Sequence, residues 1–221
     1  MQARESEKMI SVVGIGPGNP DFITIAALKR IKEADVLIGA KRHLEIFEDV
    51  RCEKVIFDSK TDLSKLIKRR GRIVILSSGD PGIYGILDAV LKYAGKRDVE
   101  VVPGISSVQY MLARLKLPAK NAAVLSMHGR RVDIVPVVKS HRIVAVFTDS
   151  RNTPQKIART LLENKIAGRI IHVGENLSYD CEKIKSYRLE ELASSEENFQ
   201  LNLVVIEKCG NTDSESPTSF L

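Results

Sequence analysis

The sequence is poor in the aromatic residues that many nucleic-acid-binding proteins require. It contains no tryptophan, and aromatic residues make up only 5% of its 221 residues. Proteins that bind single-stranded nucleic acid stack bases on aromatic side chains, and no stacking motif or zinc finger is present. We therefore expect no nucleic-acid partner, although the formal net charge of +6 favours an anionic small molecule.

Cysteines and long apolar runs are also scarce. Cys52, Cys181 and Cys209 are far apart and form no C-x-x-C pair, so we expect neither a disulfide framework nor a bound metal. No apolar run reaches the roughly 18 residues that a membrane-spanning helix needs. Residues 1–8 (MQARESEK) lack the basic and then apolar pattern of a signal peptide. These absences predict a cytoplasmic protein with no membrane partner.

Short β-branched runs alternate with amphipathic stretches in the first half of the chain. We expect strands at 10–15, 36–38, 54–57, 72–76 and 99–102. We expect helices at 24–33, 41–47, 62–70 and 106–115, with Thr24 as a candidate N-cap. Strands joined through helices need crossover connections, so the pattern predicts an α/β fold with a mainly parallel sheet.

A proline-containing segment, 116–121 (KLPAKN), breaks this pattern. Beyond it we expect strands at 122–127, 142–147, 169–173, 182–187 and 201–207. Two of these strands have no convincing long helix beside them, which predicts a smaller lobe with a mixed sheet. We therefore predict two α/β domains, 9–116 and 121–208, with flexible polar tails at 1–8 and 210–221.

Three glycine-bearing segments each follow an expected strand. They are GIGPGNPD at 14–21, SSGDPGIYG at 77–85 and VPGISS at 102–107. The first is not a dinucleotide fingerprint, because Asn19 stands where G-x-G-x-x-G requires glycine, and no Gly-Lys-Ser/Thr follows to make a phosphate loop. Each segment alone could be a simple turn. The carboxyl ends of parallel strands meet at one edge of a sheet, so together the segments predict one ligand site.

Six motifs, taken in order, resemble the tetrapyrrole methylase family. They are VGIGPGNPDFIT (13–24), GAKRHL (39–44), SSGDPG (77–82), VPGISSVQ (102–109), LSMHGR (125–130) and GENLSY (174–179). The similarity extends over about 9–208. The Lys-Arg-His and Ser-Met-His-Gly-Arg pieces favour the branch of the family that methylates C5 of a corrin precursor, with or without cobalt.

This resemblance implies two lobes that bind S-adenosylmethionine between them, an anionic corrin-type tetrapyrrole in an adjoining trough, and a homodimer. It implies cofactor contacts from Asp80, Ile83, Ser106, Ser107, Phe147, Glu175, Asn176 and Leu203. It places the glycine loop around Gly16 and Pro17 on the substrate side. Arg42 and Arg130 are candidates for charge-assisted bonds to the acetate and propionate groups of the substrate, although either could be a plain surface residue.

The chemistry of methyl transfer asks little of the protein beyond alignment and desolvation. A general base that removes the proton from the methylated carbon is the further possibility, and His128 is the candidate catalytic residue. A surface histidine at a strand end is the alternative for His128. His141 and His172 adjoin apolar strand residues and are expected to be core or edge histidines.

The sequence departs from the family where YDCEK stands at 179–183, in place of the usual Pro-Asp-Glu-Arg-like run. Some relatives carry a fused second methyltransferase that methylates C15 and removes a carboxylate. No length remains here for it, so a separate partner enzyme would perform that step. Two alternatives stay open: a sibling methylase acting on uroporphyrinogen III or a diphthine-type substrate, and a binding protein for a nucleotide-like ligand.

Overall fold

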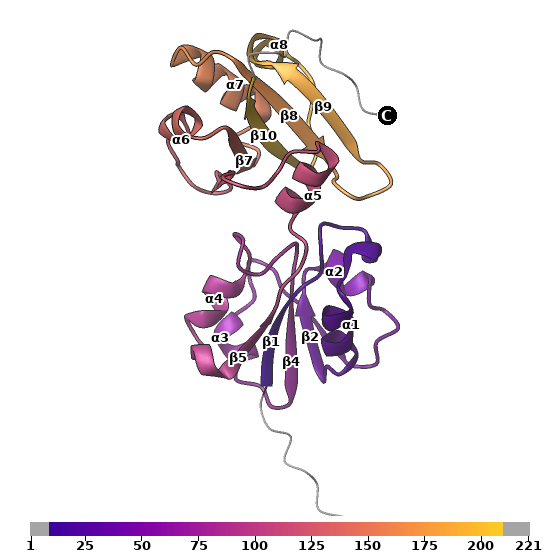
Figure 1. The fold of residues 1–221 in the computed structure, drawn as a ribbon. Helices are drawn as coiled ribbons and strands as arrows, with labels where there is room; N and C mark the ends of the chain where they lie inside the picture. Colours follow the sequence, from indigo (N-terminus) through magenta and orange to yellow (C-terminus); the bar gives the residue numbers. More distant parts are fainter. Residues whose placement is uncertain (1–8, 210–221) are drawn as a thin grey trace, which may run out of the picture. The chain divides into compact units, whose positions relative to one another are not determined.

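The computed structural model describes residues 9–209, which form two compact units that divide between Ser106 and Ser107 (Figure 1). The tails predicted at 1–8 and 210–221 lie outside the described residues. Helix α5 (Ser107–Arg114), which the predicted limits 9–116 assign to the first domain, belongs to the second unit. The reason is hydrophobic burial, because Met111 and Leu112 pack with the strands of the second unit.

Unit 1 contains a five-stranded sheet in the order β3-β2-β4-β1-β5, in which neighbouring strands run parallel. Its strands are β1 Met9–Gly14, β2 Val36–Gly39, β3 Glu53–Ile56, β4 Arg72–Ser77 and β5 Val99–Val102. Its helices are α1 Ile25–Lys32, α2 Lys41–Glu45, α3 Leu63–Leu66 and α4 Leu87–Leu91, with short 3-10 helices at η1 Pro20–Phe22 and η2 Lys96–Asp98. The predicted α/β class and parallel sheet are confirmed.

The strands of unit 1 alternate their side chains between two hydrophobic clusters. In β4, Val74 and Leu76 belong to the cluster that contains α1, whereas Ile73 and Ile75 belong to the cluster that contains α3 and α4. This period of two follows from the pleat of a strand covered on both faces. The predicted N-cap of α1 is also confirmed, since Thr24 Oγ1 accepts a hydrogen bond from Ala27 N at 3.1 Å.

Unit 2 contains a five-stranded mixed sheet in the order β6-β7-β10-β8-β9. Its strands are β6 Ala123–Ser126, β7 Ile143–Phe147, β8 Arg169–Glu175, β9 Lys183–Arg188 and β10 Asn202–Lys208. Only β6 and β7 pair in parallel, and the other pairs are antiparallel. The prediction of a mixed sheet is therefore confirmed.

Helices cover both faces of the unit 2 sheet. They are α5, α6 Val135–Ser140, α7 Pro154–Glu163 and α8 Leu189–Ser194 (Figure 1). Apolar residues of α6, α7 and α8 pack in one cluster on one face, and α5 packs in a second cluster on the other. The sheet is thus buried on both sides, which explains why β7 and β10 are almost wholly apolar.

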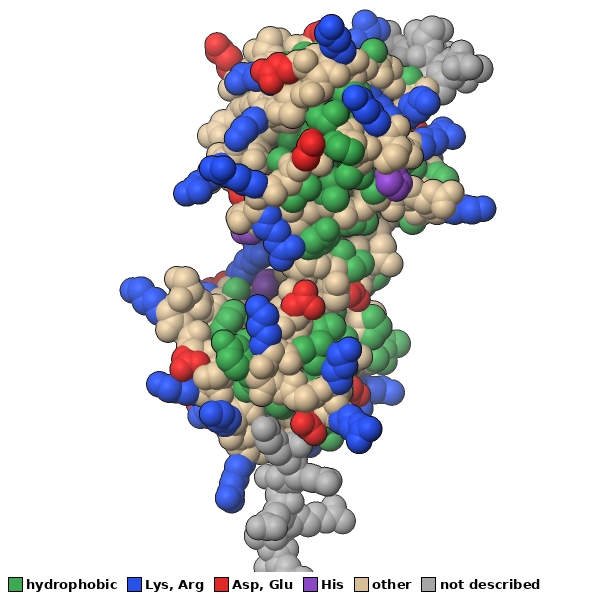
Figure 2. Space-filling view, turned by 90° about the vertical axis from the view of Figure 1, so that its left-hand side faces the viewer, with side chains coloured by type: hydrophobic (Ala, Val, Ile, Leu, Met, Phe, Trp, Pro, Cys, Tyr) green, Lys and Arg blue, Asp and Glu red, His purple; other side chains and the backbone are tan. Residues whose placement is uncertain are grey.

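The charged side chains are interspersed on the surface. Figure 2 shows Lys and Arg spread over the visible face of each unit, among acidic and apolar side chains and without a continuous basic stripe. Basic and acidic residues also alternate along the sequence, so this mixed distribution is the one expected. No helix within residues 9–209 combines the length and the apolar character that crossing a membrane requires.

Candidate active site

In unit 1, the loops that follow β1 and β4 are joined by backbone hydrogen bonds. Gly79 N donates to Gly16 O at 2.8 Å, and Gly16 N donates to Gly79 O at 3.4 Å. Both glycines have positive φ, 81° at Gly16 and 64° at Gly79, a conformation that other residues adopt at a cost. The two loops are therefore joined by an isolated antiparallel bridge just beyond the parallel strands β1 and β4.

The loop after β5 packs on the same two loops. A Cβ atom on Gly14 would lie 2.6 Å from Gly104 N and 2.6 Å from Gly79 O, and a Cβ atom on Gly104 would collide with Gly79 O. The glycines are therefore required first by the packing of the three loops on one another. The prediction that these glycines also let a ligand approach the backbone is not tested by this packing and stays a prediction.

Asp80 bonds to two of the three loops. Its Oδ1 accepts a hydrogen bond from Gly82 N at 2.8 Å, and its Oδ2 accepts one from Gly104 N at 3.1 Å. Each carboxylate oxygen has a second lone pair, so the group can still accept a bond from a ligand. Ile83 follows in the same loop and is half-buried. Next to it, Tyr84 has a positive φ of 54° and is 45% exposed.

Helix α2 begins directly after β2, at this same edge of the parallel sheet. Arg42 Nε lies 3.3 Å from His43 Nε2, and the arginine is exposed. His43 is only 9% exposed, and its Nδ1 has no hydrogen-bond partner among the described residues. Burial, followed by the charge of Arg42, lowers the pKa of His43 to about 4, so the ring is neutral at pH 7. Since Arg42 donates to Nε2, the neutral ring holds its proton on the unpartnered Nδ1.

In unit 2, four of the predicted cofactor residues lie at one edge of the sheet. Phe147 on β7 pairs with Leu203 on β10, and Glu175 on β8 pairs with Asn202 on β10. Asn176 follows Glu175, and its N–H donates to Leu201 O at 2.9 Å. The side chain of Leu203 is buried in the cluster beneath α5, which leaves its backbone for any contact with a ligand. The other two predicted cofactor residues, Ser106 and Ser107, are the last of unit 1 and the first of α5.

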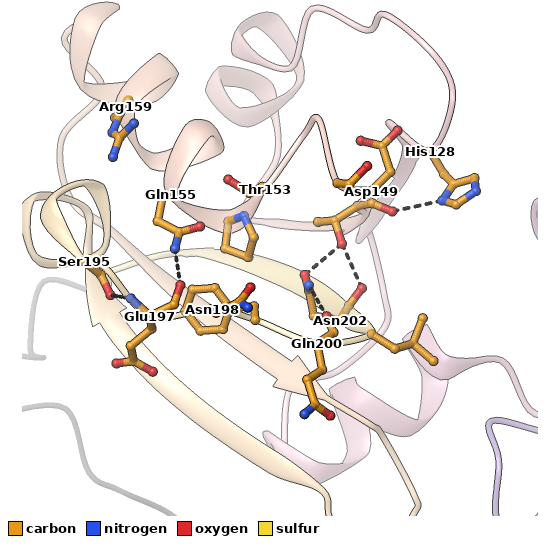
Figure 3. Close-up of a pocket in the computed structure, with 15 residues that line it drawn as sticks. His128, Asp149, Thr153, Gln155, Arg159, Ser195, Glu197, Asn198, Gln200 and Asn202 are labelled. Atoms are coloured by element: carbon orange, nitrogen blue, oxygen red, sulfur yellow. Dashed lines mark hydrogen bonds between the residues drawn. The ribbon is translucent and has the colours of Figure 1, made fainter.

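The predicted catalytic residue His128 lies in the turn after β6, together with Arg130. His128 Nδ1 lies 3.1 Å from the carbonyl oxygen of Thr148. A carbonyl can only accept, so Nδ1 carries the proton and Nε2 of the neutral ring is left to take another. The ring is thus oriented by the first residue beyond β7 (Figure 3).

A cavity of about 630 Å³ opens beside this turn, within the size range of small-molecule sites. Figure 3 shows His128 and Asp149 at one end of it and Arg159 toward the other. The remaining lining comes from the connection after β7, the start of α7, the segment before β10 and the first residue of β10: Thr148, Ser150, Thr153, Pro154, Gln155, Ser195, Glu197, Asn198, Phe199, Gln200, Leu201 and Asn202. Thr148 and Asp149 were not among the predicted site residues, although a polar run directly after a buried strand is a signal that indicates such positions.

Two further predictions concern residues away from these edges. His172 is 7% exposed, with Nδ1 2.8 Å from Ser186 Oγ and Nε2 3.4 Å from Glu207 Oε2, so the prediction of a core histidine is confirmed. The 179–183 segment, which departs from the family, forms the connection from β8 to β9. Within it, Glu182 accepts from Ser178 N at 2.7 Å and pairs with Arg114 of α5 at 2.9 Å. These contacts give the segment an anchoring role.

The comparisons with known proteins agree with this arrangement. The model of the family described as tetrapyrrole (corrin/porphyrin) methylases matches residues 9–193, and the chain belongs to that family. The chain is 37% identical over 201 residues to the cobalt-precorrin-7 C(5)-methyltransferase of Salmonella typhimurium, which covers 90% of this chain and 98% of the relative.

Two solved structures have the same fold. One is the cobalamin biosynthesis precorrin-6Y methylase from Archaeoglobus fulgidus, with a TM-score of 0.69, 25% identity and coverage of 91% of this chain and 98% of that one. The other is the uroporphyrin-III C-methyl transferase from Thermus thermophilus complexed with S-adenosyl homocysteine, with a TM-score of 0.75, 23% identity and coverage of 90% and 97%. The second comparison supports the fold alone.

Proposed function

We propose that this protein transfers a methyl group from S-adenosylmethionine to C5 of a cobalt-precorrin or precorrin intermediate in cobalamin biosynthesis. The observation that supports this most directly is the identity of 37% to a cobalt-precorrin-7 C(5)-methyltransferase over nearly the full length of both chains. The precorrin-6Y methylase fold supports the same reaction. The uroporphyrin-III C-methyl transferase from Thermus thermophilus is only 23% identical to this chain, so its similarity supports the fold and not the alternative substrate.

The residues at the loop edge of unit 1 fit a bound ligand. Asp80 retains acceptor capacity beside the glycine loops, and the buried Nδ1 of His43 lacks a partner among the described residues. A buried donor without a partner is costly, so a ligand or a water that bonds to it would stabilise the site. When bound, S-adenosylmethionine supplies a methyl group already activated by its sulfonium charge.

Our proposal keeps cofactor contacts on each unit. In unit 1, they come from the loop after β4 and the end of the loop after β5: Asp80, Ile83 and Ser106. In unit 2, they come from the start of α5 and from the sheet edge: Ser107, Phe147, Glu175, Asn176 and Leu203. These residues would bind and orient the cofactor, and Asp80 would also hold two of the loops in place.

The carboxylate groups of the substrate would be recognised by exposed arginines, and the shape of its macrocycle by the loop after β1. Arg42 and Arg130 would pair with carboxylate groups of the tetrapyrrole, since a guanidinium forms bidentate bonds with such groups. Gly16 and Pro17 would contact the macrocycle. His128 Nε2 would take the proton from the methylated carbon, while Nδ1–H stays bonded to Thr148 O.

We further propose that the enzyme is a cytoplasmic homodimer, and that a separate enzyme methylates C15 and removes the carboxylate. The homodimer is tested by sedimentation of the purified protein with and without S-adenosyl homocysteine. A monomer at micromolar concentration would contradict the dimer.

The proposed reaction is tested with isotopically labelled S-adenosylmethionine. The purified protein is incubated with cobalt-precorrin-7, metal-free precorrin-6y and uroporphyrinogen III in parallel. We expect label at C5 of a corrin precursor and none in uroporphyrinogen III. Label only in uroporphyrinogen III would support the sibling methylase, and tight binding of the cofactor without transfer to any substrate would support a binding protein.

A further inference from the structure

We infer that Asp149 is a positioning residue for the turn formed by residues 127–130, and that it holds His128 and Arg130 in place for the tetrapyrrole. This inference rests on the proposed function, because that function gives His128 and Arg130 their roles. It assigns a part in the reaction to a residue in the connection after β7, which none of the six family-like motifs contains.

The two turns concerned follow neighbouring parallel strands. Ser126, the last residue of β6, pairs with Phe147, the last residue of β7. Met127 N then donates to Phe147 O at 2.9 Å, so the ladder continues by one bond past the strands. The turn at 127–130 and the turn at 148–152 therefore leave the sheet side by side at the same edge.

The carboxylate of Asp149 connects these turns. Its Oδ2 accepts from Gly129 N at 2.7 Å, across 20 residues of sequence. Its Oδ1 accepts from Arg151 N at 2.8 Å and from Asn152 N at 2.7 Å within its own turn. A carboxylate that only stabilised its own turn would make just the bonds to Arg151 N and Asn152 N. The bond to Gly129 is the one that reaches the turn bearing His128.

Asn152 completes the connection. Its Nδ2 donates to Met127 O at 2.8 Å and to Asp149 Oδ1 at 3.1 Å. Asn152 thus binds the carbonyl of Met127 in the first turn, while Asp149 binds the N–H of Gly129 in the same turn. Together with the bond from His128 Nδ1 to Thr148 O, three contacts fix the first turn at successive residues.

Met127 packs against the hydrophobic cluster of α6, α7 and α8, but the rest of the turn has little packing and depends on these polar contacts. His128, Gly129 and Arg130 are all exposed. No described atom lies within 4 Å of the place where a Cβ on Gly129 would stand, although its φ is +65°. The glycine is therefore required by the backbone conformation and not by crowding.

The ionised state of Asp149 agrees with this role. Hydrogen bonds from backbone N–H groups, that of Gly129 first, lower the pKa of Asp149 to about 2. The carboxylate is thus charged and able to accept at any pH where the enzyme would work. Asp149 also lines the end of the cavity beside His128 (Figure 3), so a shift of the turn would change both the ring and the cavity wall.

The test compares Asp149→Asn with a matched control, Asp133→Asn. Asp133 lies in the connection from β6 to α6, and its Oδ1 accepts from Val135 N at 3.1 Å. Within the described residues it makes no hydrogen bond to the turn at 127–130. For each variant, the Michaelis constants for the corrin precursor and for S-adenosylmethionine are measured, with kcat and Tm. An amide in place of the carboxylate loses the acceptor for Gly129 N or for the second turn.

For Asp149→Asn, we expect KM for the corrin precursor to rise at least fivefold and kcat to fall, with KM for S-adenosylmethionine within twofold of wild type. For Asp133→Asn, both constants should stay within twofold. Gly129→Ala, which strains the same turn without touching the carboxylate, should show the same selective loss as Asp149→Asn. Wild-type constants in a folded Asp149→Asn variant, or equal increases in both constants, would overturn the inference.

Hydrogen exchange separates this inference from the proposed function. If the wild-type protein methylates none of the corrin precursors, the proposed function fails and so does the catalytic part of the inference. The structural part is still measured: amide exchange in the 127–130 segment should accelerate at least tenfold in Asp149→Asn and remain unchanged in Asp133→Asn. Unchanged exchange in Asp149→Asn would overturn the positioning role even in an active enzyme.

Discussion

The carboxylate of Asp80 accepts a hydrogen bond from the backbone N–H of Gly104, which lies 24 residues further along the chain. With its second bond to Gly82 N, this side chain ties the loop after β4 to the loop after β5. A residue that the sequence predicted to touch the cofactor thus also holds the loops together. Its substitution should therefore affect both binding and loop order.

Asp80→Ala should weaken the binding of S-adenosyl homocysteine. The change removes a charged acceptor for the ligand and leaves two backbone N–H groups of the loops without theirs. A hydrogen bond to a charged group contributes about 1.5 to 3 kcal/mol, which is roughly 10- to 150-fold in affinity. Titration calorimetry measures the effect. Asp88→Ala, an exposed aspartate at the start of α4, is the control and should bind as wild type. A change below about threefold in Asp80→Ala would remove Asp80 from the site.

Gly104→Ala should destabilise unit 1. The added methyl group meets backbone atoms of Gly79 and Gly14, which cannot move aside without breaking the loops. Overpacking of this kind costs about 1 to 3 kcal/mol, which urea unfolding would detect. Gly95→Ala is the matched control, because the nearest atom to its Cβ is the flexible carboxylate of Asp98. Equal stability of the two variants would contradict the packing of the three loops.

S-adenosyl homocysteine should raise the Tm of the protein. A ligand that binds only the folded state stabilises it by about 2.7 kcal/mol at a concentration of 100 times its Kd. For a chain of this size, that corresponds to several degrees. Differential scanning fluorimetry with adenosine as the comparison ligand measures the shift. The absence of any shift at millimolar ligand would reject the cofactor assignment.

His43 should make stability depend on pH between about 4 and 6.5. Its pKa is lowered to about 4 in the folded protein, against about 6.5 when unfolded. The unfolded state therefore binds the extra proton in this window, so the contribution of His43 is complete above pH 6.5 and is lost as the pH falls toward 4. The free energy of unfolding of His43→Gln, measured at pH 7, 5.5 and 4.5, should fall less steeply than that of wild type.

Asp149 affects stability at a lower pH than His43, so the contributions of the two side chains can be measured separately. Its pKa of about 2 lies below the ordinary value near 3.9. Its contribution is present above about pH 4 and is lost only as the pH falls toward 2. Asp149→Asn should therefore leave the slope between pH 4.5 and 7 as in wild type. A changed slope in that window would assign the effect to another group.

Arg42→Ala and Arg130→Ala should each raise KM for the corrin precursor and leave KM for S-adenosylmethionine nearly unchanged. Binding that relies on exposed charges should also weaken with salt, because screening acts over about 8 Å at physiological ionic strength. Measurements at 50 and 500 mM salt test this. Arg97→Ala, an exposed arginine of η2, is the control. Unchanged KM for the precursor in both variants would defeat recognition by these arginines.

Much of the fold could be predicted because a buried strand is indicated by a short run of apolar, β-branched residues next to one another in the sequence. The β-branched runs at β1, β4, β7 and β10 and the cap at Thr24 depend on neighbouring residues alone. Helix α7 was missed although Thr153 and Pro154 give it a cap and a first-turn proline, and Thr153 Oγ1 accepts from Lys156 N. Helix α6 (VPVVKS) is rich in β-branched residues, so tertiary packing and not propensity determines it.

Residues of the candidate site could be proposed from the sequence only where a motif contained them. The sequence indicated the glycine loops and His128, but not the contacts that Asp149 makes. The bond from Asp149 to Gly129 depends on the register of β6 against β7, and no local pattern specifies a register between strands that far apart. The assignment of α5 to the second unit could not be predicted either, because it depends on the packing of Met111 and Leu112 against strands distant in the sequence.

The mutual packing of Gly14, Gly79 and Gly104 limits how this enzyme can be redesigned. A Cβ on Gly14 or on Gly104 would meet backbone atoms of the other two glycines, so no compensating side-chain change elsewhere could make room for it, and Gly79 has a φ of +64° that disfavours other residues. Libraries that vary these three positions should yield almost no folded members. New substrate preferences would have to come from side chains that the loops display, such as Ser78 and Tyr84, which are exposed.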